Sequence, residues 1–532
     1  MGVLASLVCK GEAQSVSVGT KHTCVIVMDG RVKCWGNNSK GQLGLGDMDP
    51  RGKTNGTMGD NLPFVDLGTG RTAVAISAGE QHTCAILDND LLKCWGYGSG
   101  GRLVGGDEVA NHGDVPNTMG ENLPYVDLGT NRTVLQVAAG EDFTCALLDN
   151  FMVKCFGHNH HGQLGTGNRS SQGNSDNEVG DGLPYVDLGT SRTALAITNG
   201  PCALLDNYML KCWGENLYGA AGVPGAENVG DDDDEMGDNL AHIALGTGLT
   251  TYSAASGLYH NCAIVDGGDV KCWGKNTKGN LGIGSVHDKG DDEGEMADEL
   301  QHASLGTPAI YLEAGNDHTC ALLKDGNVKC WGGNLEGSLG TRDFKSRGYF
   351  PAQMGEYLLP VDLGTNVWAL EVAAGGDSTC ASLSDGNLKC WGNGNHGALG
   401  YENAQDQGDE WDEMGDYLEP VDLGTGITVM PPLMNYGLFL SFQFFDSPTA
   451  SPTASPTALS PTRVPMPASV PENLATSNPV STPTTSPASA DLATARPVSA
   501  PTTGPAPTLI TSPAPTPTTS PAPTPTTSPV PT

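Results

Sequence analysis

HTCAILDNDLLKCWG, residues 82–96, places two cysteines ten positions apart, and near-copies of this stretch recur along the chain. Seven such pairs occur, and their first cysteines are separated by 60, 61, 57, 60, 58 and 60 residues. The pairs are Cys24 with Cys34, Cys84 with Cys94, Cys145 with Cys155, Cys202 with Cys212, Cys262 with Cys272, Cys320 with Cys330, and Cys380 with Cys390. A regular period of this length indicates an internal repeat, in which each copy packs against its neighbours.

The residues between the cysteines have the pattern of a β-hairpin. In VIVMDGRVK, residues 25–33, a three-residue turn is centred on Asp29 and ends in a glycine, where a left-handed conformation closes such a loop. Counting outward from Asp29 sets Cys24 opposite Cys34, with Cβ atoms about 4.5–5.5 Å apart. The same count holds in the other six repeats, and a small relaxation would bring each pair within disulfide distance.

A second recurring block precedes the cysteine hairpins and supplies further strands. It reads LPFVDLGTGRTAVAISAG at 62–79 and LPYVDLGTNRTVLQVAAG at 123–140, where VDLG and the later apolar run each predict a strand. Each repeat then contributes four short strands, and seven such units predict an all-β fold, a seven-bladed β-propeller. The first repeat starts partway through, at SVSVG (15–19), without a VDLG segment of its own. The missing segment is present at the other end of the repeats, in PVDLGTGITVM at 420–430. We therefore expect pairing of the N- and C-terminal strands to close the propeller.

Composition divides the chain into four segments. Residues 1–10 have the features of a weak or truncated leader, because their apolar run is short and no basic residue precedes it. Residues 11–430 hold the repeats, 431–446 are an apolar connector of unclear role, and 447–532 are a Ser/Thr/Pro-rich segment that predicts a disordered stalk. The sequence contains no apolar stretch of about 18 residues, so no transmembrane segment is expected.

The repeated pattern resembles that of a known family. GTKHTCVIVMDGRVKCWGNNSKGQLG at 19–44 and GNDHTCALLKDGNVKCWGGNLEGSLG at 315–340 are similar to repeats of the regulator of chromosome condensation family, whose members form seven-bladed propellers. The resemblance covers residues 11–430, and its seven ordered copies imply the same fold. A fold of this kind carries several functions, so the family alone does not settle what the chain does.

The functions known in the family can be compared with this sequence. The founding nuclear member exchanges nucleotide on a small GTPase and docks on chromatin, but this chain has no basic arm for such docking. The plant ultraviolet-B photoreceptor uses tryptophans in a GWRHT motif, whereas matching stretches here, such as GTKHT at 19–23 and GEQHT at 79–83, contain none. A secreted bacterial inhibitor of β-lactamase shares the fold, which implies that the propeller can serve as a rigid protein-binding disc outside the cell.

The paired cysteines have four interpretations: disulfide bonds, reduced core thiols, redox centres or metal ligands. Nine residues separate the two cysteines of a pair, whereas zinc ligands are typically about two to four residues apart. The cross-strand register favours disulfides, each closing a loop of about ten residues and stabilising the fold by about 2–3 kcal/mol. Because disulfides persist in oxidising compartments, the pattern predicts an extracellular or cell-surface protein. Cys9 is left without a partner.

Four histidines, His22, His82, His260 and His318, precede their cysteines by two positions. In a propeller these positions lie in different blades and cannot converge on one ligand, so a structural hydrogen-bonding role is expected. The sequence contains no phosphate-binding loop, HExxH zinc motif or serine nucleophile elbow. The chain is therefore predicted not to be an enzyme, with no catalytic, cofactor-binding or metal-binding residue.

A net charge of −34 argues against a nucleic-acid partner and favours basic partners or cations. Many acidic residues gather in connectors such as GDDDDEMGD at 230–238, GDDEGEMADE at 290–299 and GDEWDEMGD at 408–416. Calcium binding is one interpretation of these oxygen-rich clusters. None of them has the EF-hand spacing, so we prefer to interpret them as a solvated acidic rim.

Together these patterns predict a non-catalytic module that binds a protein or glycan partner outside the cell and is displayed on a flexible stalk. Two alternatives stay open. One is an intracellular regulator of the same family, a nucleotide exchange factor or scaffold with reduced cysteines, and the other is a cell-wall or matrix structural protein. The fourth repeat, TNGPCALL at 198–205, lacks three residues that the others carry before the cysteine, and we expect a feature specific to one face there.

Overall fold

The computed structural model describes residues 14–104 and 111–432 of the 532-residue chain. All described residues belong to one compact unit. The expected leader, the stalk and most of the apolar connector lie outside the described residues. No helix within the described ranges has the length and the apolar character that crossing a bilayer requires.

The described residues form β-strands and short 3-10 helices. The strands are β1 (Val16–Val18), β2 (His22–Ile26), β3 (Val32–Gly36), β4 (Ala73–Ala78), β5 (His82–Leu87), β6 (Leu92–Gly96), β7 (Val134–Ala139), β8 (Phe143–Leu148), β9 (Val153–Gly157), β10 (Ala194–Ile197), β11 (Cys202–Leu205), β12 (Leu210–Cys212), β13 (Gly214–Glu215), β14 (Asn228–Val229), β15 (Thr251–Ser256), β16 (His260–Val265), β17 (Asp269–Gly274), β18 (His302–Ala303), β19 (Ala309–Ala314), β20 (His318–Leu323), β21 (Val328–Gly332), β22 (Ala369–Gly375), β23 (Ser378–Leu383) and β24 (Leu388–Gly392). The 3-10 helices are η1 (Gly59–Asn61), η2 (Ser99–Gly101), η3 (Gly120–Asn122), η4 (Asp176–Glu178), η5 (Gly180–Gly182), η6 (Leu217–Gly219), η7 (Gly237–Asn239), η8 (Asp266–Gly268), η9 (Ala297–Glu299), η10 (Pro351–Gln353), η11 (Gly355–Tyr357), η12 (Asn395–Gly397) and η13 (Gly415–Tyr417).

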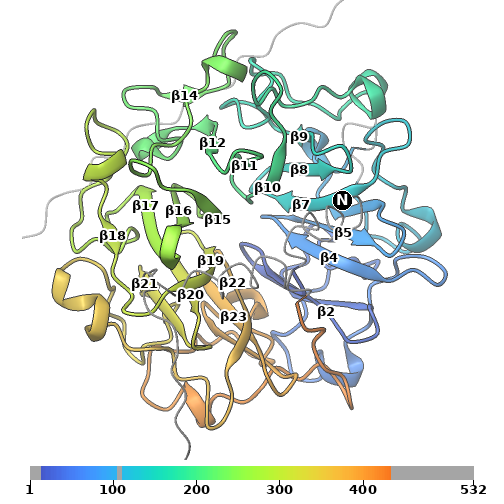
Figure 1. Cartoon of the computed structure of the whole chain (residues 1–532). Coiled ribbons are helices and arrows are strands. Elements are labelled where there is room, and N and C mark those ends of the chain that lie inside the picture. Colours follow the sequence, from blue (N-terminus) through green and yellow to red (C-terminus); the bar gives the residue numbers. More distant parts are fainter. Residues whose placement is uncertain (1–13, 105–110, 433–532) are drawn as a thin grey trace, which may run out of the picture. The chain divides into compact units, whose positions relative to one another are not determined.

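Consecutive strands form small antiparallel sheets, and seven of these each contain one cysteine hairpin (Figure 1). The predicted hairpin register is confirmed, because Cys24 lies opposite Cys34 and Val25 opposite Lys33. The two cysteines face each other in the same way in the other six sheets. Gly30 ends the turn with a φ of +79°, the left-handed conformation that this register requires.

The VDLG segments differ from the prediction that each repeat forms four strands. In the described residues only the fifth repeat has a strand at this place, the two-residue β18. In the second repeat, the backbone N–H of Val126 makes one hydrogen bond to the oxygen of Leu92. The Lys93 ammonium meanwhile donates to the backbone oxygens of Leu67 and Gly120. Leu67 lies in the VDLG segment at 65–68 and Gly120 in η3, so a lysine side chain of the next hairpin contacts this segment, and the VDLG segments lie largely outside the sheets.

Neighbouring sheets pack against each other and share apolar cores. One core combines Ile26 of β2 with Leu87 of β5 and the side chain of Trp95 in β6. The indole N–H of Trp95 also donates a hydrogen bond of 3.0 Å to the backbone oxygen of Gln42 in the preceding repeat. In the six repeats that carry this tryptophan, both apolar burial and a buried hydrogen bond hold the sheet to the one before it, whereas the third repeat has Phe156 at this position.

The same contacts join the first sheet to the last. Strand β1 packs against both β4 and β22, and the indole N–H of Trp35 donates to the backbone oxygen of Ala398 in the seventh repeat at 2.9 Å. Near the end of the described chain, Val429 forms an antiparallel bridge with Val27. The N-terminal and C-terminal segments of the repeat region therefore meet beside β2.

Candidate binding surfaces

In the structure a disulfide bond joins the two cysteines of each of the seven predicted pairs, with Cα atoms 4.0–4.1 Å apart. The bonded pairs are Cys24 with Cys34, Cys84 with Cys94, Cys145 with Cys155, Cys202 with Cys212, Cys262 with Cys272, Cys320 with Cys330, and Cys380 with Cys390. All fourteen of these side chains are buried in the cores between sheets. The bridges lie in seven separate hairpins and do not converge. Their positions suit structural cross-links inside each repeat rather than one shared chemical site.

The four histidines link neighbouring sheets, which confirms their expected hydrogen-bonding role. In each case Nε2 lies 2.8–2.9 Å from the hydroxyl of the threonine that precedes the first cysteine of the next repeat. The pairs are His22–Thr83, His82–Thr144, His260–Thr319 and His318–Thr379. Burial lowers the pKa of His22, His260 and His318 to about 4, so these imidazoles are neutral at physiological pH.

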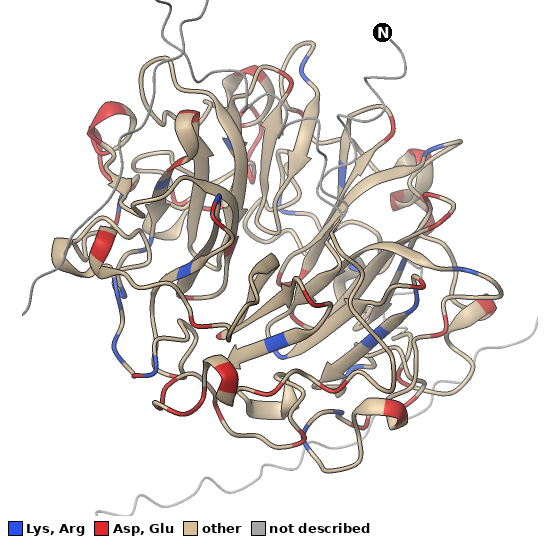
Figure 2. Cartoon of the chain, turned by 60° about the horizontal axis from the view of Figure 1, so that its bottom comes forward, with Lys and Arg blue, Asp and Glu red and all other residues tan. Residues whose placement is uncertain are grey.

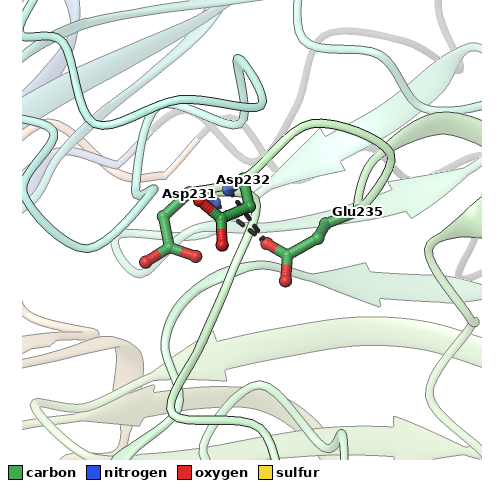
Figure 3. Close-up of side chains that lie close together, drawn as sticks. All are labelled: Asp231, Asp232 and Glu235. Carbon is green, nitrogen blue, oxygen red and sulfur yellow. Dashed lines mark hydrogen bonds between the residues drawn. The ribbon is translucent and has the colours of Figure 1, made fainter.

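The acidic connectors owe part of their pattern to backbone hydrogen bonding. In Figure 3, the Glu235 carboxylate accepts hydrogen bonds from the N–H groups of Asp231 and Asp232, and the same oxygen accepts one from Gly230 at 2.8 Å. Asp231 also forms an ion pair of 2.9 Å with Arg169. Carboxylate oxygens of Asp231, Asp232 and Glu235 lie within 4.8 Å of one another, but these contacts account for the cluster as a stabilised turn.

Large aromatic side chains are exposed on the connectors of the sixth and seventh repeats. We name four of them the aromatic connector residues: Phe350, Tyr357, Trp411 and Tyr417, which are 65, 73, 68 and 63% exposed. The rings of Trp411 and Tyr417 meet edge to face, with centroids 5.9 Å apart. Exposed aromatic groups that are held in place by a neighbour resemble the anchors of protein interfaces.

The sequence contained a signal for these residues that the prediction missed. Tyr357 and Tyr417 follow the Met-Gly-acid stretch at the position that holds Asn61 in the first repeat, Asn122 in the second and Asn239 in the fourth. An alignment of the connectors therefore shows that the sixth and seventh repeats carry a tyrosine at a position where the first, second and fourth carry an asparagine. Their exposure could not be read from sequence, because an aromatic residue in a repeat protein is more often part of the core.

The surface around the connectors is strongly acidic. Figure 2 shows Asp and Glu on many of the short helices and loops between sheets. Of the 27 Lys and Arg residues in the chain, seven are lysines buried beside the second cysteines, where each donates hydrogen bonds to backbone oxygens. These lysines are Lys33, Lys93, Lys154, Lys211, Lys271, Lys329 and Lys389. The carboxylates therefore face solvent with few basic neighbours.

Comparison with protein families gives repeated matches along the chain. The model described as "Regulator of chromosome condensation (RCC1) repeat" matches six segments, and a second model with the same description matches residues 29–86. The six segments are 13–42, 73–102, 134–163, 253–280, 310–338 and 370–398. In every repeat except the shortened fourth, the matched segment coincides with the first strand of the sheet and the cysteine hairpin that follows it.

Individual proteins show the same relationship. The chain is 28% identical over 342 residues to the ultraviolet-B receptor UVR8 of Arabidopsis thaliana, covering 63% of this chain and 69% of the receptor. It is 27% identical over 377 residues to the E3 ubiquitin-protein ligase HERC2 of Homo sapiens, covering 70% of this chain but only 7% of the ligase. Among solved structures, human WBSCR16 matches with a TM-score of 0.50 and 18% identity, over 68% of this chain and 84% of that protein. The chain is a β-propeller protein that contains regulator of chromosome condensation (RCC1) repeats.

Proposed function

We propose that this chain is a non-catalytic protein-binding module whose residues 11–430 form a closed seven-bladed propeller. Seven sheets with equivalent hairpins support the blade count. The bridge between Val27 and Val429 supports closure. The Trp35–Ala398 hydrogen bond repeats, between the last and first sheets, a contact that other successive sheets make.

The exposure of the four aromatic connector residues is the observation that carries this proposal. Aromatic residues are enriched at the centres of protein interfaces because they bury a large area with few rotatable bonds. Here they stand on two successive repeats among carboxylates such as Glu410 and Asp412, which flank Trp411 along the chain. We infer that the partner presents an apolar patch with a basic margin, since the opposite charges would speed encounter and fix orientation.

We further propose that the module works outside the cell, on the Ser/Thr/Pro-rich stalk. Seven bridges inside one domain are expected only where the chain passes through an oxidising compartment. An intracellular regulator with reduced cysteines is the competing proposal, and a wall or matrix structural protein is a third. The intracellular regulator predicts free thiols, whereas the structural protein predicts that the stalk and not the propeller determines function.

The binding proposal is tested by giving the last two repeats the residues of the first. The fourfold variant combines Phe350→Thr, Tyr357→Asn, Trp411→Asn and Tyr417→Asn. Each new residue is the one that the first repeat has at the equivalent position, namely Thr54 for 350, Asn55 for 411, and Asn61 for 357 and 417. The partner is identified by cross-linking the wild-type protein in its native source, and its affinity for both proteins is then measured.

We expect the fourfold variant to bind this partner at least tenfold more weakly, because its apolar anchors are removed. The matched control replaces two methionines that are similarly exposed elsewhere, Met28→Gln and Met48→Gln, which are 58 and 56% exposed. Unchanged affinity in the fourfold variant, with the fold intact by circular dichroism, would remove the basis of the proposal.

A further inference from the structure

The fourth repeat is short at one end of its sheet. The first strand of its sheet, β10, has four residues, whereas the equivalent strands β4, β7, β15 and β19 have six each. Strand β11 begins at Cys202 itself, while β5 begins two residues before its cysteine. The three residues missing from the sequence therefore shorten two neighbouring strands and the turn between them.

In the other repeats this turn brings neighbouring backbones into close contact. A Cβ atom on Gly19 would clash with the backbone oxygen of Gly79, and one on Gly79 would clash with that of Gly140. On the far side of the fourth repeat, Gly257 meets the oxygen of Gly315 in the same way. The three atoms nearest to a Cβ on Gly140 all belong to the ring of Phe143, so the closest approach at this turn is to a side chain and not to a neighbouring backbone.

A cavity of about 540 Å³ is ringed by the turns that precede the first cysteines of all seven repeats. Asn199, Gly200 and Pro201 of the shortened turn form one part of its wall. Small-molecule and side-chain pockets typically have volumes of about 300–1,000 Å³, so this one can hold an extended side chain with part of its backbone.

Four carboxylates, Glu80, Glu141, Asp142 and Glu215, line the cavity together with a single arginine, Arg102. Burial raises the pKa of Glu141, and the neighbouring charges of Glu80, Asp142 and Glu215 raise it further. These groups are therefore close enough to repel one another. A positively charged ligand would relieve that repulsion.

His260 adds an unused acceptor to the same wall. The hydroxyl of Thr319 donates its single proton to the backbone oxygen of Asn280 at 3.2 Å, so it must accept the hydrogen bond from Nε2 of His260. The proton of the neutral imidazole is then on Nε2, and Nδ1 carries a lone pair. This Nδ1 is buried without a hydrogen-bond partner among the described residues, and His260 lines the cavity.

An aromatic face completes the wall. Tyr259 lines the cavity, and its ring meets that of Tyr218 edge to face with centroids 5.7 Å apart. Aromatic faces attract ammonium and guanidinium groups when water is partly excluded. The Tyr259 ring already has the Lys275 ammonium 5.5 Å from its centroid, so the carboxylates and the imidazole lone pair are the groups that favour a further cation carrying several N–H donors.

We propose that this cavity binds an organic cation, an ammonium or guanidinium group. The group can belong to a lysine or arginine side chain of a partner protein or to a free polyamine. Metal ions fit less well, because Ca²⁺ needs six to eight oxygens at about 2.3–2.6 Å and this cavity is wide and partly aromatic. The site is separate from the aromatic connector residues, so it does not depend on the binding surface proposed above.

Titration calorimetry of the purified chain tests the proposal with two probes, spermidine and the capped tripeptide Gly-Arg-Gly. Glu141→Gln with Glu215→Gln removes two charges from the cavity, and we expect at least a tenfold loss of affinity for the probe that binds. Asp233→Asn with Asp234→Asn removes the same charge from an exposed connector and is the matched control, which we expect to leave affinity unchanged.

A second variant narrows the cavity. Replacing 199–201 by AGQQHT, the turn 78–83 of the second repeat with glutamine in place of Glu80 so that no carboxylate is added, restores a turn of normal length, and we expect binding to weaken at least tenfold. In the wild type, the bound probe should also shift the ¹⁵N resonance of His260 Nδ1. Binding of the tripeptide alone would assign the site to a partner side chain, and binding of spermidine alone to a free polyamine. Equal weakening by the cavity and connector variants, or no binding by either probe, would overturn the proposal.

Discussion

Replacing His318 by phenylalanine should make the repeat region less sensitive to acid. His318 is buried between sheets, and its Nε2 lies 2.8 Å from the hydroxyl of Thr379. The third repeat already carries Phe143 at this position, and both rings pack in the same way against the preceding glycine, Gly315 or Gly140. A phenylalanine ring therefore fits the site of the imidazole.

The pH dependence follows from the pKa of His318 in the folded and unfolded chains. Burial lowers this pKa to about 4, although Asp317 opposes the shift, whereas the unfolded value is about 6.5. Between these values the unfolded chain binds the proton more readily, so stability is lost as pH falls from about 6.5 to 4. The loss attributable to one such histidine is about 2 kcal/mol at pH 5 and reaches about 3 kcal/mol below pH 4.

Unfolding by guanidinium chloride at pH 7, 6 and 5, with the disulfides intact, measures this effect. At pH 7 the His318→Phe variant should be less stable by about 1 kcal/mol, because one buried hydrogen bond is lost. At pH 5 the order should reverse, since the wild type alone loses about 2 kcal/mol through protonation of this histidine. A stability difference between the two proteins that stays constant from pH 7 to pH 5 would refute the argument.

Three further predictions concern other parts of the chain. Phe151 and Tyr208 end their hairpin turns with φ of 61° and 62°, so replacing each by glycine should raise the free energy of unfolding by up to about 1 kcal/mol, measured by thermal denaturation. Burial raises the pKa of Glu371 from 4.5 to about 7, so the stability that its protonated form contributes is present below pH 4.5 and is lost as pH rises from 4.5 to about 7. Glu371→Gln should abolish that pH dependence in denaturation curves. Because this carboxylate accepts hydrogen bonds from the N–H and hydroxyl of Ser15, the same variant should speed amide exchange in β1. Deleting 447–532 should leave affinity for the partner unchanged but release the protein from the cell surface, and loss of affinity would favour the structural-protein alternative.

The hairpins were predictable because a local rule sets them. A three-residue turn fixes which residues face each other, so Asp29 alone places Cys24 opposite Cys34, as the structure has it. The VDLG segments were not predictable in the same way, because their contacts join residues far apart in the sequence, such as Lys93 and the backbone oxygen of Leu67. Sequence shows that a lysine alternates with apolar residues, but not which distant carbonyl it binds.

The candidate sites depended even more on contacts distant in sequence. The three-residue deletion in the fourth repeat was visible in the sequence, but the cavity is formed by turns of all seven repeats, and Glu80, Glu141 and Glu215 come to it from three different repeats. The acidic connectors were interpreted as a solvated rim with calcium binding as an alternative, and the structure adds that the Glu235 carboxylate accepts hydrogen bonds from the backbone of its own turn. In both cases residue type was informative and the neighbours decided the role.

A free-thiol count with non-reducing peptide mapping, on protein purified from its native source, tests the central claim most directly. We predict that fourteen cysteines are blocked and that every cross-linked peptide joins the two cysteines of one repeat, such as Cys24 with Cys34. This result would place the chain in an oxidising compartment and direct the search for its partner outside the cell. Fourteen free thiols would contradict the claim and make the intracellular regulator the better description.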